Sequence, residues 1–255
     1  MSQKVAFITG GASGIGLATA QALARAGHHV VIADIQTAAA QTAAEQIRSD
    51  QLSASAVPLD VSSDEAWRSA IGSVEQEHGR LDVLVNNAGL GEGGTLDSTS
   101  LEAFNRMLAV NVGGVFLGCK YAIPLMQRSG GGSVINVSSI FGIVSDQLTL
   151  AYSASKGAVR TMTKSIALDC ATRNTGVRVN SIHPGFIETP MVMNAAAVTP
   201  AEIIEPYAAR TVGQTPMGRF GQPDELADVI VFLASEASRF MTGSEVTVDG
   251  GFTAR

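Results

Sequence analysis

The sequence predicts an α/β protein with a doubly wound fold, in which a seven-stranded parallel sheet carries helices on both faces. Short apolar runs rich in valine and isoleucine recur seven times, and longer segments with helical periodicity lie between them. Apolar strands that alternate with helices are typical of a parallel sheet buried on both faces. Hydrophobic residues make up 45% and charged residues 16% of the 255 residues, enough for a large core. We therefore expect a single domain over residues 1–255.

The expected strands are short, as buried strands are, and each is almost continuously apolar. In chain order they are 5–9 (VAFIT), 29–34 (HVVIAD), 54–60 (ASAVPLD), 82–87 (DVLVNN), 133–139 (SVINVSS), 177–184 (VRVNSIHP) and 244–249 (SEVTVD).

Helical periodicity follows the first strand at 15–27 and the third at 64–79. Two longer helices are expected at 101–127 and 152–173, and both carry apolar residues on more than one face.

The stretch 186–220 breaks this alternation. It has little regular period and is rich in proline and methionine, and long excursions of this kind often form lids over a site. Its prolines are Pro190, Pro200, Pro206 and Pro216.

The charge pattern excludes some classes of partner. The net charge is −6 and lysines and arginines form no cluster, so a nucleic-acid partner is not expected. The first residues lack the basic start and cleavage site of a signal peptide. No apolar run approaches the roughly 18 residues of a membrane span. We expect a cytoplasmic protein with no membrane partner.

The cysteines and histidines indicate neither a disulfide nor a metal centre. Two reduced, buried thiols are the favoured interpretation, because disulfides are rare in the cytosol. The histidines show no metal-ligand spacing, and no metal is expected. The residues concerned are Cys119, Cys170, His28, His29, His78 and His183.

Glycines follow the first strand and lead into a helix. Gly10, Gly14 and Gly16 allow a positive φ and a close approach of backbone, and the helix that follows directs its partial positive charge at a pyrophosphate. A merely tight strand-to-helix turn is the alternative. With Thr9 before them, the glycines resemble the Thr-Gly-x-x-x-Gly-x-Gly signature of the short-chain dehydrogenase/reductase family, which has a Rossmann fold. The resemblance extends over essentially the whole chain and implies cofactor contacts for Ser13 and Ile15 as well.

Asp34 ends the second strand, where a carboxylate can accept hydrogen bonds from the adenosine ribose and would repel a 2′-phosphate. The family often places a basic residue for NADP at positions that here hold Ser13 and Ile35, and neither is charged. NAD is therefore the expected cofactor. The alternative role of Asp34 is to cap the next helix.

Tyr152 and Lys156 lie four residues apart on one face of an expected helix. Tyrosine has an ordinary pKa near 10, too high for a base at neutral pH. An ammonium about 4 Å away supplies roughly 4 kcal/mol at an effective dielectric near 20, which lowers the tyrosine pKa by about three units. An exposed helical pair without a role in chemistry is the alternative.

Ser139 ends the fifth expected strand, thirteen residues before Tyr152. This spacing matches that of the family and favours Ser139 over Ser138. The hydroxyl can hydrogen-bond a substrate oxygen and polarise a carbonyl. A surface serine that caps a turn is the alternative.

Further site residues come from the resemblance alone. It implies that Asn111 is the fourth catalytic residue, interrupting a helix and anchoring a water. It also implies that Tyr152 and Lys156 contact the cofactor, with Lys156 at the nicotinamide ribose. The run NNAG (Asn86 to Gly89) is implied to stabilise the sheet and border the cofactor. The other implied cofactor contacts are Asp60 and Val61 at the adenine, Asn87, Ala88 and Gly89 in the NNAG run, and Pro184, Gly185, Ile187 and Thr189 beside the nicotinamide.

The resemblance implies an NAD-dependent oxidoreductase that interconverts a secondary alcohol and a ketone. In this scheme NAD accepts hydride while Tyr152, as phenolate, removes the hydroxyl proton, and reduction runs backwards. A hydroxysteroid dehydrogenase and a 3-oxoacyl carrier-protein reductase are the enzyme alternatives. A cofactor-binding scaffold without catalysis is the alternative from another class.

A small apolar alcohol or ketone is the expected substrate, because the presumed lid is mainly apolar, although such residues also pack cores and subunit contacts. Arg210 is the one arginine placed where it could clamp a substrate carboxylate. By resemblance, the chain assembles as a homotetramer through 101–127, 152–173 and the last strand. The apolar lid residues are Met191, Val192, Met193, Ala195, Ala196, Ala197, Val198, Ile203, Ile204 and Tyr207.

Overall fold

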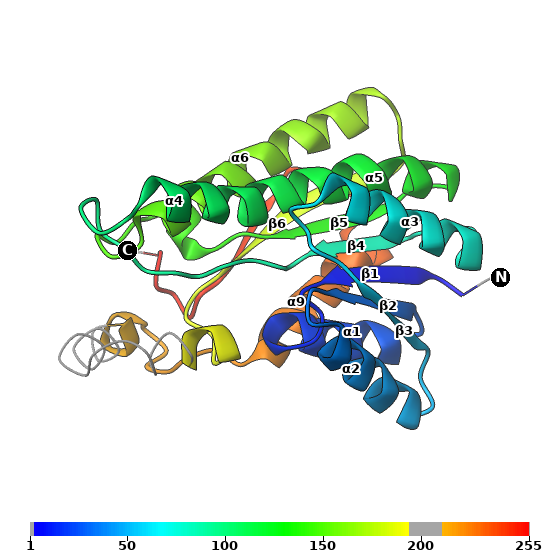
Figure 1. The fold of residues 1–255 in the computed structure, drawn as a ribbon, viewed down its shortest axis with the longest axis horizontal. Coiled ribbons are helices and arrows are strands. Elements are labelled where there is room, and N and C mark those ends of the chain that lie inside the picture. Colours follow the sequence, from blue (N-terminus) through cyan, green and yellow to red (C-terminus); the bar gives the residue numbers. More distant parts are fainter. Residues whose placement is uncertain (1–2, 194–210, 255) are drawn as a thin grey trace.

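A computed structural model describes residues 3–193 and 211–254. Its centre is a seven-stranded sheet of order β3-β2-β1-β4-β5-β6-β7, parallel throughout (Figure 1). The doubly wound fold predicted from the sequence is confirmed. The strands are β1 (Val5–Thr9), β2 (His29–Asp34), β3 (Ala54–Pro58), β4 (Val83–Asn86), β5 (Gly132–Val137), β6 (Val177–Pro184) and β7 (Glu245–Val248).

Helices cover both faces of the sheet (Figure 1). One layer contains α1 (Gly14–Arg25), α2 (Thr37–Ser49) and α9 (Pro223–Ala234). The other layer contains α3 (Asp64–His78), α4 (Leu101–Leu108), the π-helix η1 (Ala109–Gly113), α5 (Gly114–Arg128) and α6 (Leu150–Thr172). Two short 3₁₀ turns are η2 (Ile140–Gly142) and η3 (Glu236–Ser238).

The two helix layers enclose separate hydrophobic cores, which explains why the strands are apolar along their whole length. In β1, Phe7 points into the core beneath α3 and α5, and Ile8 points into the core beneath α1 and α9. Successive strand residues face opposite sides of a sheet, so both sides of β1 must be apolar. Cys119 and Cys170 are buried free thiols, as predicted.

The strand order reverses between β1 and β4, with β2 and β3 on one side of this point and β5 to β7 on the other. Open parallel sheets bind ligands at the carboxyl ends of their strands beside such a switch point. The loops after β1, β4 and β5 therefore frame the candidate site.

One helical stretch, Leu101–Arg128, is long and apolar enough to cross a membrane by length and composition alone. It passes on its average hydropathy, whereas Arg106 and Lys120 interrupt the apolar run within it. The stretch includes α4, η1 and α5, and its apolar residues Val115, Ala122 and Met126 belong to the core on the sheet. Packing in the fold accounts for its hydropathy, and a cytoplasmic location stays a prediction.

The excursion 186–220 is described at 186–193 and 211–220. Met191 lies against Gly91, in the loop that follows β4, so the first part of the excursion approaches the candidate site. Arg210 lies outside the described residues. The same is true of the remaining residues expected to form the lid, which are Ala195, Ala196, Ala197, Val198, Ile203, Ile204 and Tyr207.

Candidate active site

The glycine loop after β1 forms a backbone cradle at the start of α1. Gly10 and Gly14 adopt positive φ values of 61° and 52°. A Cβ atom on Gly16 would lie 2.1 Å from the carbonyl oxygen of Gly10, so only glycine fits there. Ser13 precedes the helix with extended backbone and makes no side-chain cap, as far as the described residues show. The first N–H groups of α1 are thus available to an anion such as a pyrophosphate.

The NNAG run fastens this cradle to the end of β4. The Thr9 hydroxyl oxygen accepts hydrogen bonds of 3.0 Å from the backbone N–H groups of Asn87 and Ala88. The Asn87 side chain donates back to the carbonyls of Thr9 at 3.0 Å and Gly10 at 3.1 Å. These residues set the shape of the loop, and Gly89 lies beside Asn111 and Lys156.

Asp34 is buried at the carboxyl end of β2, beside the glycine loop. Its carboxylate accepts hydrogen bonds from the backbone N–H of Ala12 at 3.2 Å and of Gln36 at 2.9 Å. The second bond goes to the residue that precedes α2, so it shapes the turn before that helix and does not cap the helix itself. The same carboxylate therefore links the cradle, the second strand and the turn before the second helix.

Asp60 and Val61, the expected adenine contacts, lie in the turn after β3. Asp60 is exposed, and its carboxylate accepts hydrogen bonds from the backbone and hydroxyl of Ser62 at 2.9 and 2.7 Å. Val61 is buried in the core against Gly114. The Val61 side chain is therefore committed to packing, which leaves its backbone as the part able to face an adenine.

Ser139 and Ser138 have different partners. The Ser138 hydroxyl donates to the backbone carbonyl of Lys156 at 2.9 Å, and so ties β5 to α6. The Ser139 hydroxyl oxygen accepts from the N–H of Phe141 at 3.1 Å, and the Ser139 side chain lies near enough to the Tyr152 hydroxyl to lower its pKa. Of the two serines, Ser139 is thus the one that lies with the tyrosine.

Lys156 is buried one helical turn after Tyr152, at 5% exposure. Its Nζ donates to the carbonyl of Val137 at 2.9 Å and lies 5.6 Å from the centre of the Tyr152 ring. Burial lowers the pKa of Lys156 to about 8. The ammonium is held between the end of β5 and the face of the tyrosine ring.

The pKa of Tyr152 was expected to be lowered by Lys156, and this prediction is wrong for the arrangement in the structure. Burial raises the pKa of the Tyr152 hydroxyl, and the Ser139 side chain offsets part of that rise. The Lys156 Nζ donates to the Val137 carbonyl and lies over the face of the Tyr152 ring. Burial of the hydroxyl therefore outweighs the lowering of the pKa that was expected from Lys156.

Asn111 lies in the π-helix η1, so the helix is interrupted where the resemblance implied. Its Oδ1 accepts from the backbone N–H of Leu90 at 2.7 Å, and its Nδ2 donates to the Leu90 carbonyl at 3.0 Å. Nδ2 also lies 3.0 Å from the hydroxyl of Ser155, between Tyr152 and Lys156 on α6. Asn111 thereby joins the loop after β4 to the helix that carries the tyrosine.

The Pro-Gly turn after β6 brings its residues to the same edge. The N–H of Gly185 donates to the carbonyl of Val248 at 2.9 Å, Ile187 is buried, and Thr189 lies against Gly14 of the cradle. Pro184, which ends β6, is paired in register with Val248.

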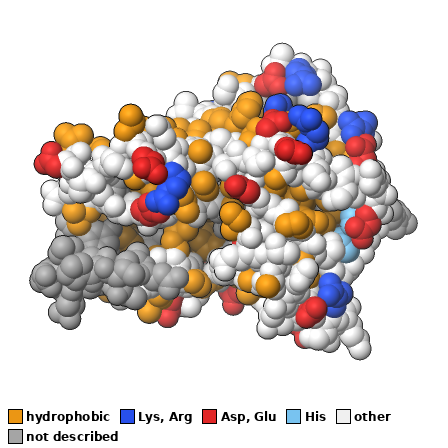
Figure 2. Space-filling view, viewed as in Figure 1, with side chains coloured by type: hydrophobic (Ala, Val, Ile, Leu, Met, Phe, Trp, Pro, Cys, Tyr) orange, Lys and Arg blue, Asp and Glu red, His pale blue; other side chains and the backbone are white. Residues whose placement is uncertain are grey.

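The structure adds residues that the sequence did not single out. Phe141 packs edge-on to Tyr152 at 6.4 Å between ring centres, and Phe186 packs edge-on to Phe141 at 5.9 Å. Ser155 is the buried partner of Asn111. The sequence signal that could have found them was their position next to predicted site residues. Phe141 follows Ser139, Phe186 follows Gly185, and Ser155 lies between Tyr152 and Lys156. Figure 2 shows hydrophobic side chains in a hollow on the face of the molecule that it views.

The fold and the glycine cradle at its switch point are typical of dinucleotide-binding proteins. A family model described as enoyl-(acyl carrier protein) reductase, a model of short-chain dehydrogenases/reductases, matches residues 10–253. The chain belongs to the short-chain dehydrogenase/reductase family, whose members use a nicotinamide cofactor.

Relatives match over nearly their full length. The NADP-dependent (R)-specific alcohol dehydrogenase of Lentilactobacillus kefiri is 42% identical, over 99% of this chain and 97% of that protein. The cyclopentanol dehydrogenase of Comamonas sp. (strain NCIMB 9872) is 41% identical, over 100% of this chain and 98% of that protein. The crystal structure of gox2181 superposes with a TM-score of 0.93 at 36% identity, covering 100% of this chain and 97% of that one.

Proposed function

We propose that this protein is an NAD-dependent oxidoreductase that interconverts a secondary alcohol and a ketone, with a small and largely apolar substrate. One observation carries the proposal: Ser139 and Tyr152 lie close together at the carboxyl edge of the sheet, with the buried Lys156 ammonium over the face of the tyrosine ring. The glycine cradle and Asp34 lie at the same edge and fit a dinucleotide.

The residues divide the chemistry among them. The cofactor, when bound on the glycine cradle, supplies the hydride acceptor for oxidation and the donor for reduction. Ser139 donates a hydrogen bond to the substrate oxygen, and Tyr152 takes the hydroxyl proton as the phenolate during oxidation and gives its own proton to the ketone oxygen as the phenol during reduction. The positive charge of Lys156 favours the phenolate once the proton leaves. Asn111 holds the loop after β4 against α6, and a proton relay would run between these two segments.

Asp34 supports NAD over NADP. A 2′-phosphate on the adenosine ribose would meet a buried carboxylate that two backbone N–H groups already hold in place. Ile35, the next residue, is 69% exposed and uncharged. The relative from Lentilactobacillus kefiri is named as NADP-dependent. The proposed cofactor of this protein therefore differs from the cofactor of that relative.

Replacing Asp34 tests the cofactor preference. The Asp34→Asn variant removes the negative charge and keeps a hydrogen-bond acceptor for the backbone. We expect the ratio of kcat/KM for NAD to that for NADP to fall at least tenfold, because the repulsion of the 2′-phosphate is lost. The matched control is Asp50→Asn at an exposed carboxylate that follows the far end of α2, which should leave the ratio unchanged. A wild-type enzyme that prefers NADP would contradict the proposal.

An apolar substrate agrees with the surroundings of Tyr152. Phe141 packs against the Tyr152 ring and Phe186 packs against Phe141, so that aromatic rings adjoin the tyrosine, and relatives are named for cyclopentanol and cyclohexanol. Such surroundings suit a compact ring or alkyl chain better than a charged group.

The proposed function is tested by NADH formation with a panel of alcohols and NADH consumption with the matching ketones. The panel contains cyclopentanol, cyclohexanol, 2-alkanols, 1-phenylethanol, a hydroxysteroid and a 3-hydroxyacyl thioester. We expect the highest kcat/KM for the small cyclic or aryl alcohols. Highest activity with the steroid or the thioester would select one of those alternatives. Binding of NAD without turnover of any member would support a catalytically silent scaffold.

A further inference from the structure

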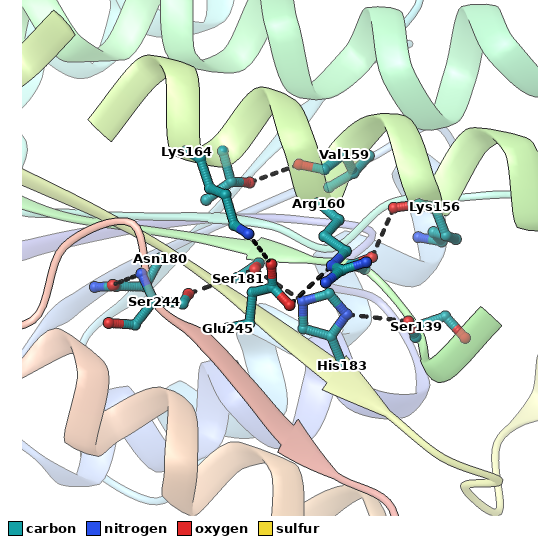
Figure 3. A network of polar contacts seen from close by, with 12 residues as sticks. Ser139, Lys156, Val159, Arg160, Lys164, Asn180, Ser181, His183, Ser244 and Glu245 are labelled. Atoms are coloured by element: carbon teal, nitrogen blue, oxygen red, sulfur yellow. Dashed lines mark hydrogen bonds and ion pairs between the residues drawn. The ribbon is translucent and has the colours of Figure 1, made fainter. Parts of the chain in front are cut away.

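His183 is a completely buried side chain that the proposed chemistry leaves without a role. It lies on β6 directly before Pro184, at the edge where the catalytic side chains gather. Figure 3 shows its ring between the turn that carries Ser139 on one side and Glu245 of β7 on the other.

The hydrogen bonds of His183 define its tautomer. Nδ1 lies 3.1 Å from the backbone carbonyl oxygen of Ser139, and a carbonyl can only accept, so Nδ1 carries a proton. Nε2 lies 2.9 Å from the hydroxyl of Ser181. Burial lowers the pKa of His183 below its ordinary value, so the ring is neutral and Nε2 accepts from Ser181.

Among the described residues, the charged groups near the His183 ring form ion pairs with one another and none with His183. Glu245 on β7 bonds to Arg160 on α6 at 2.8 Å and to Lys164, also on α6. Glu245 raises the pKa of His183, while Arg160 and Lys156 lower it, and burial is the largest influence. The imidazole is thus free to serve as a neutral donor and acceptor.

The bond to Ser139 lies just beyond the last rung of the sheet. The N–H of Ser138 donates to the carbonyl of Ile182 at 2.9 Å. At the next residue, the Ser139 carbonyl accepts from Gly142 within its own 3₁₀ turn at 2.9 Å and from His183 across to β6. The His183 side chain therefore continues the connection between β5 and β6 at the peptide whose hydroxyl meets Tyr152.

We propose that His183 is a positioning residue, which as the neutral Nδ1–H tautomer holds the Ser139 peptide so that the serine hydroxyl faces Tyr152 and the substrate oxygen. The kinetic consequence rests on the proposed alcohol dehydrogenase function. The tautomer and its bond to Ser139 do not depend on that function.

A pair of substitutions separates the two bonds of the ring. In His183→Asn, the amide nitrogen takes the place of Nδ1 and can still donate to Ser139. In His183→Gln, the longer side chain reaches Ser181 but leaves the Ser139 carbonyl without this donor. We expect His183→Asn to keep kcat within about threefold of wild type and His183→Gln to lose at least tenfold, with KM for NAD unchanged in both.

Matched controls use His29, which bonds to Ser53 and Ser55 at 2.7 and 2.9 Å at the far end of the sheet. His29→Asn and His29→Gln should have equal kcat values. Thermal unfolding and NADH binding by fluorescence are measured for every variant. Equal kcat in the two His183 variants, or losses that follow Tm and NADH affinity, would overturn the proposal.

Nitrogen-15 NMR of the cofactor-free enzyme at pH 7 gives a readout that needs no activity. We expect the His183 ring, identified by its absence from the spectrum of His183→Asn, to show a protonated Nδ1 and an unprotonated Nε2. A protonated Nε2 would refute the proposed tautomer. If the wild-type enzyme turned over no alcohol but showed this tautomer, the proposed function would fail while the structural part of the inference stood.

Discussion

Burial governs the protonation of the residues at the centre of the site. Tyr152 has a raised pKa, Lys156 has a pKa of about 8, and His183 has a lowered pKa, in each case with burial as the largest cause. Each shift favours the neutral form of its group. A site of this kind holds its proton-transfer groups close to neutrality, at a cost in stability wherever a charge stays buried.

That cost can be measured at Lys156. Its pKa of about 8 in the folded protein lies below the ordinary value of 10.5, so between these values the unfolded chain binds more protons than the folded one. The buried ammonium therefore lowers stability by about 3 kcal/mol below pH 8, and this penalty fades as the pH rises toward 10.5. The Lys156→Met variant should lose activity yet have a higher Tm at pH 7.

The gain in Tm for Lys156→Met should be several degrees at pH 7, because the lost hydrogen bond to Val137 offsets only about 1 kcal/mol. It should shrink to nothing by about pH 10.5. The control is Lys120→Met, an exposed partner of Asp64, for which no gain is expected. A gain that is independent of pH would show that packing, and not the charge, is responsible.

At the scale of helices and strands, the apolar runs were sufficient to predict all seven strands, but the carboxyl ends of β3, β4, β5 and β7 were placed one or two residues too late. Asp60, Asn87 and Ser139 were assigned to strands, whereas β3, β4 and β5 end at Pro58, Asn86 and Val137. These polar residues bond to a turn or to the glycine loop. Sequence periodicity cannot distinguish such bonds from those of the sheet.

The sequence predicted which residues lie at the site better than it predicted the contacts between them. The helical spacing of Tyr152 and Lys156 places both residues on one face, but the direction of the lysine toward Val137 depends on how α6 packs on β5. The link from His183 to Ser139 depends on the alignment of β5 with β6. Contacts set by the packing of distant segments carry no local sequence signal.

The first turn of α1 offers a test at the same scale. Gly16→Ala would place a methyl group 2.1 Å from the Gly10 carbonyl oxygen and must displace the glycine loop. We expect the Kd for NADH to rise at least a hundredfold, with a lower Tm. In contrast, a Cβ on Gly72 in α3 meets nothing within 4 Å. Gly72→Ala should leave NADH binding unchanged and add about 0.5–1 kcal/mol of stability. Unchanged NADH affinity in Gly16→Ala would contradict the proposed cradle.

At the scale of the whole molecule, one sheet with two helix layers brings distant segments to a single edge, and it also leaves apolar side chains on its outer surface. Phe116 on α5 and Leu168 on α6 are 51% and 69% exposed. Both helices lie in the layer that covers one face of the sheet (Figure 1). Exposed apolar groups of this kind often mark contacts between subunits.

We propose a homotetramer in which α5 and α6 contribute one interface. Sedimentation equilibrium of the wild type should give a mass near four times the 26.3 kDa chain. The double variant Phe116→Glu/Leu168→Glu should give a smaller species, because it places charge in a desolvated contact. The matched variant is Glu65→Gln on α3, which should leave the mass unchanged. A monomeric wild type would refute the assembly.

The central claim is that Tyr152 transfers the substrate proton in an alcohol–ketone reaction. Its most direct test compares single-turnover NADH formation from cyclopentanol and NAD in the wild type and in Tyr152→Phe, with NADH binding measured by fluorescence. We predict that Tyr152→Phe binds NADH as the wild type does while the rate of NADH formation falls by about a thousandfold, since only the proton-transfer group is removed. A rate within tenfold of wild type, with equal NADH binding, would contradict the account.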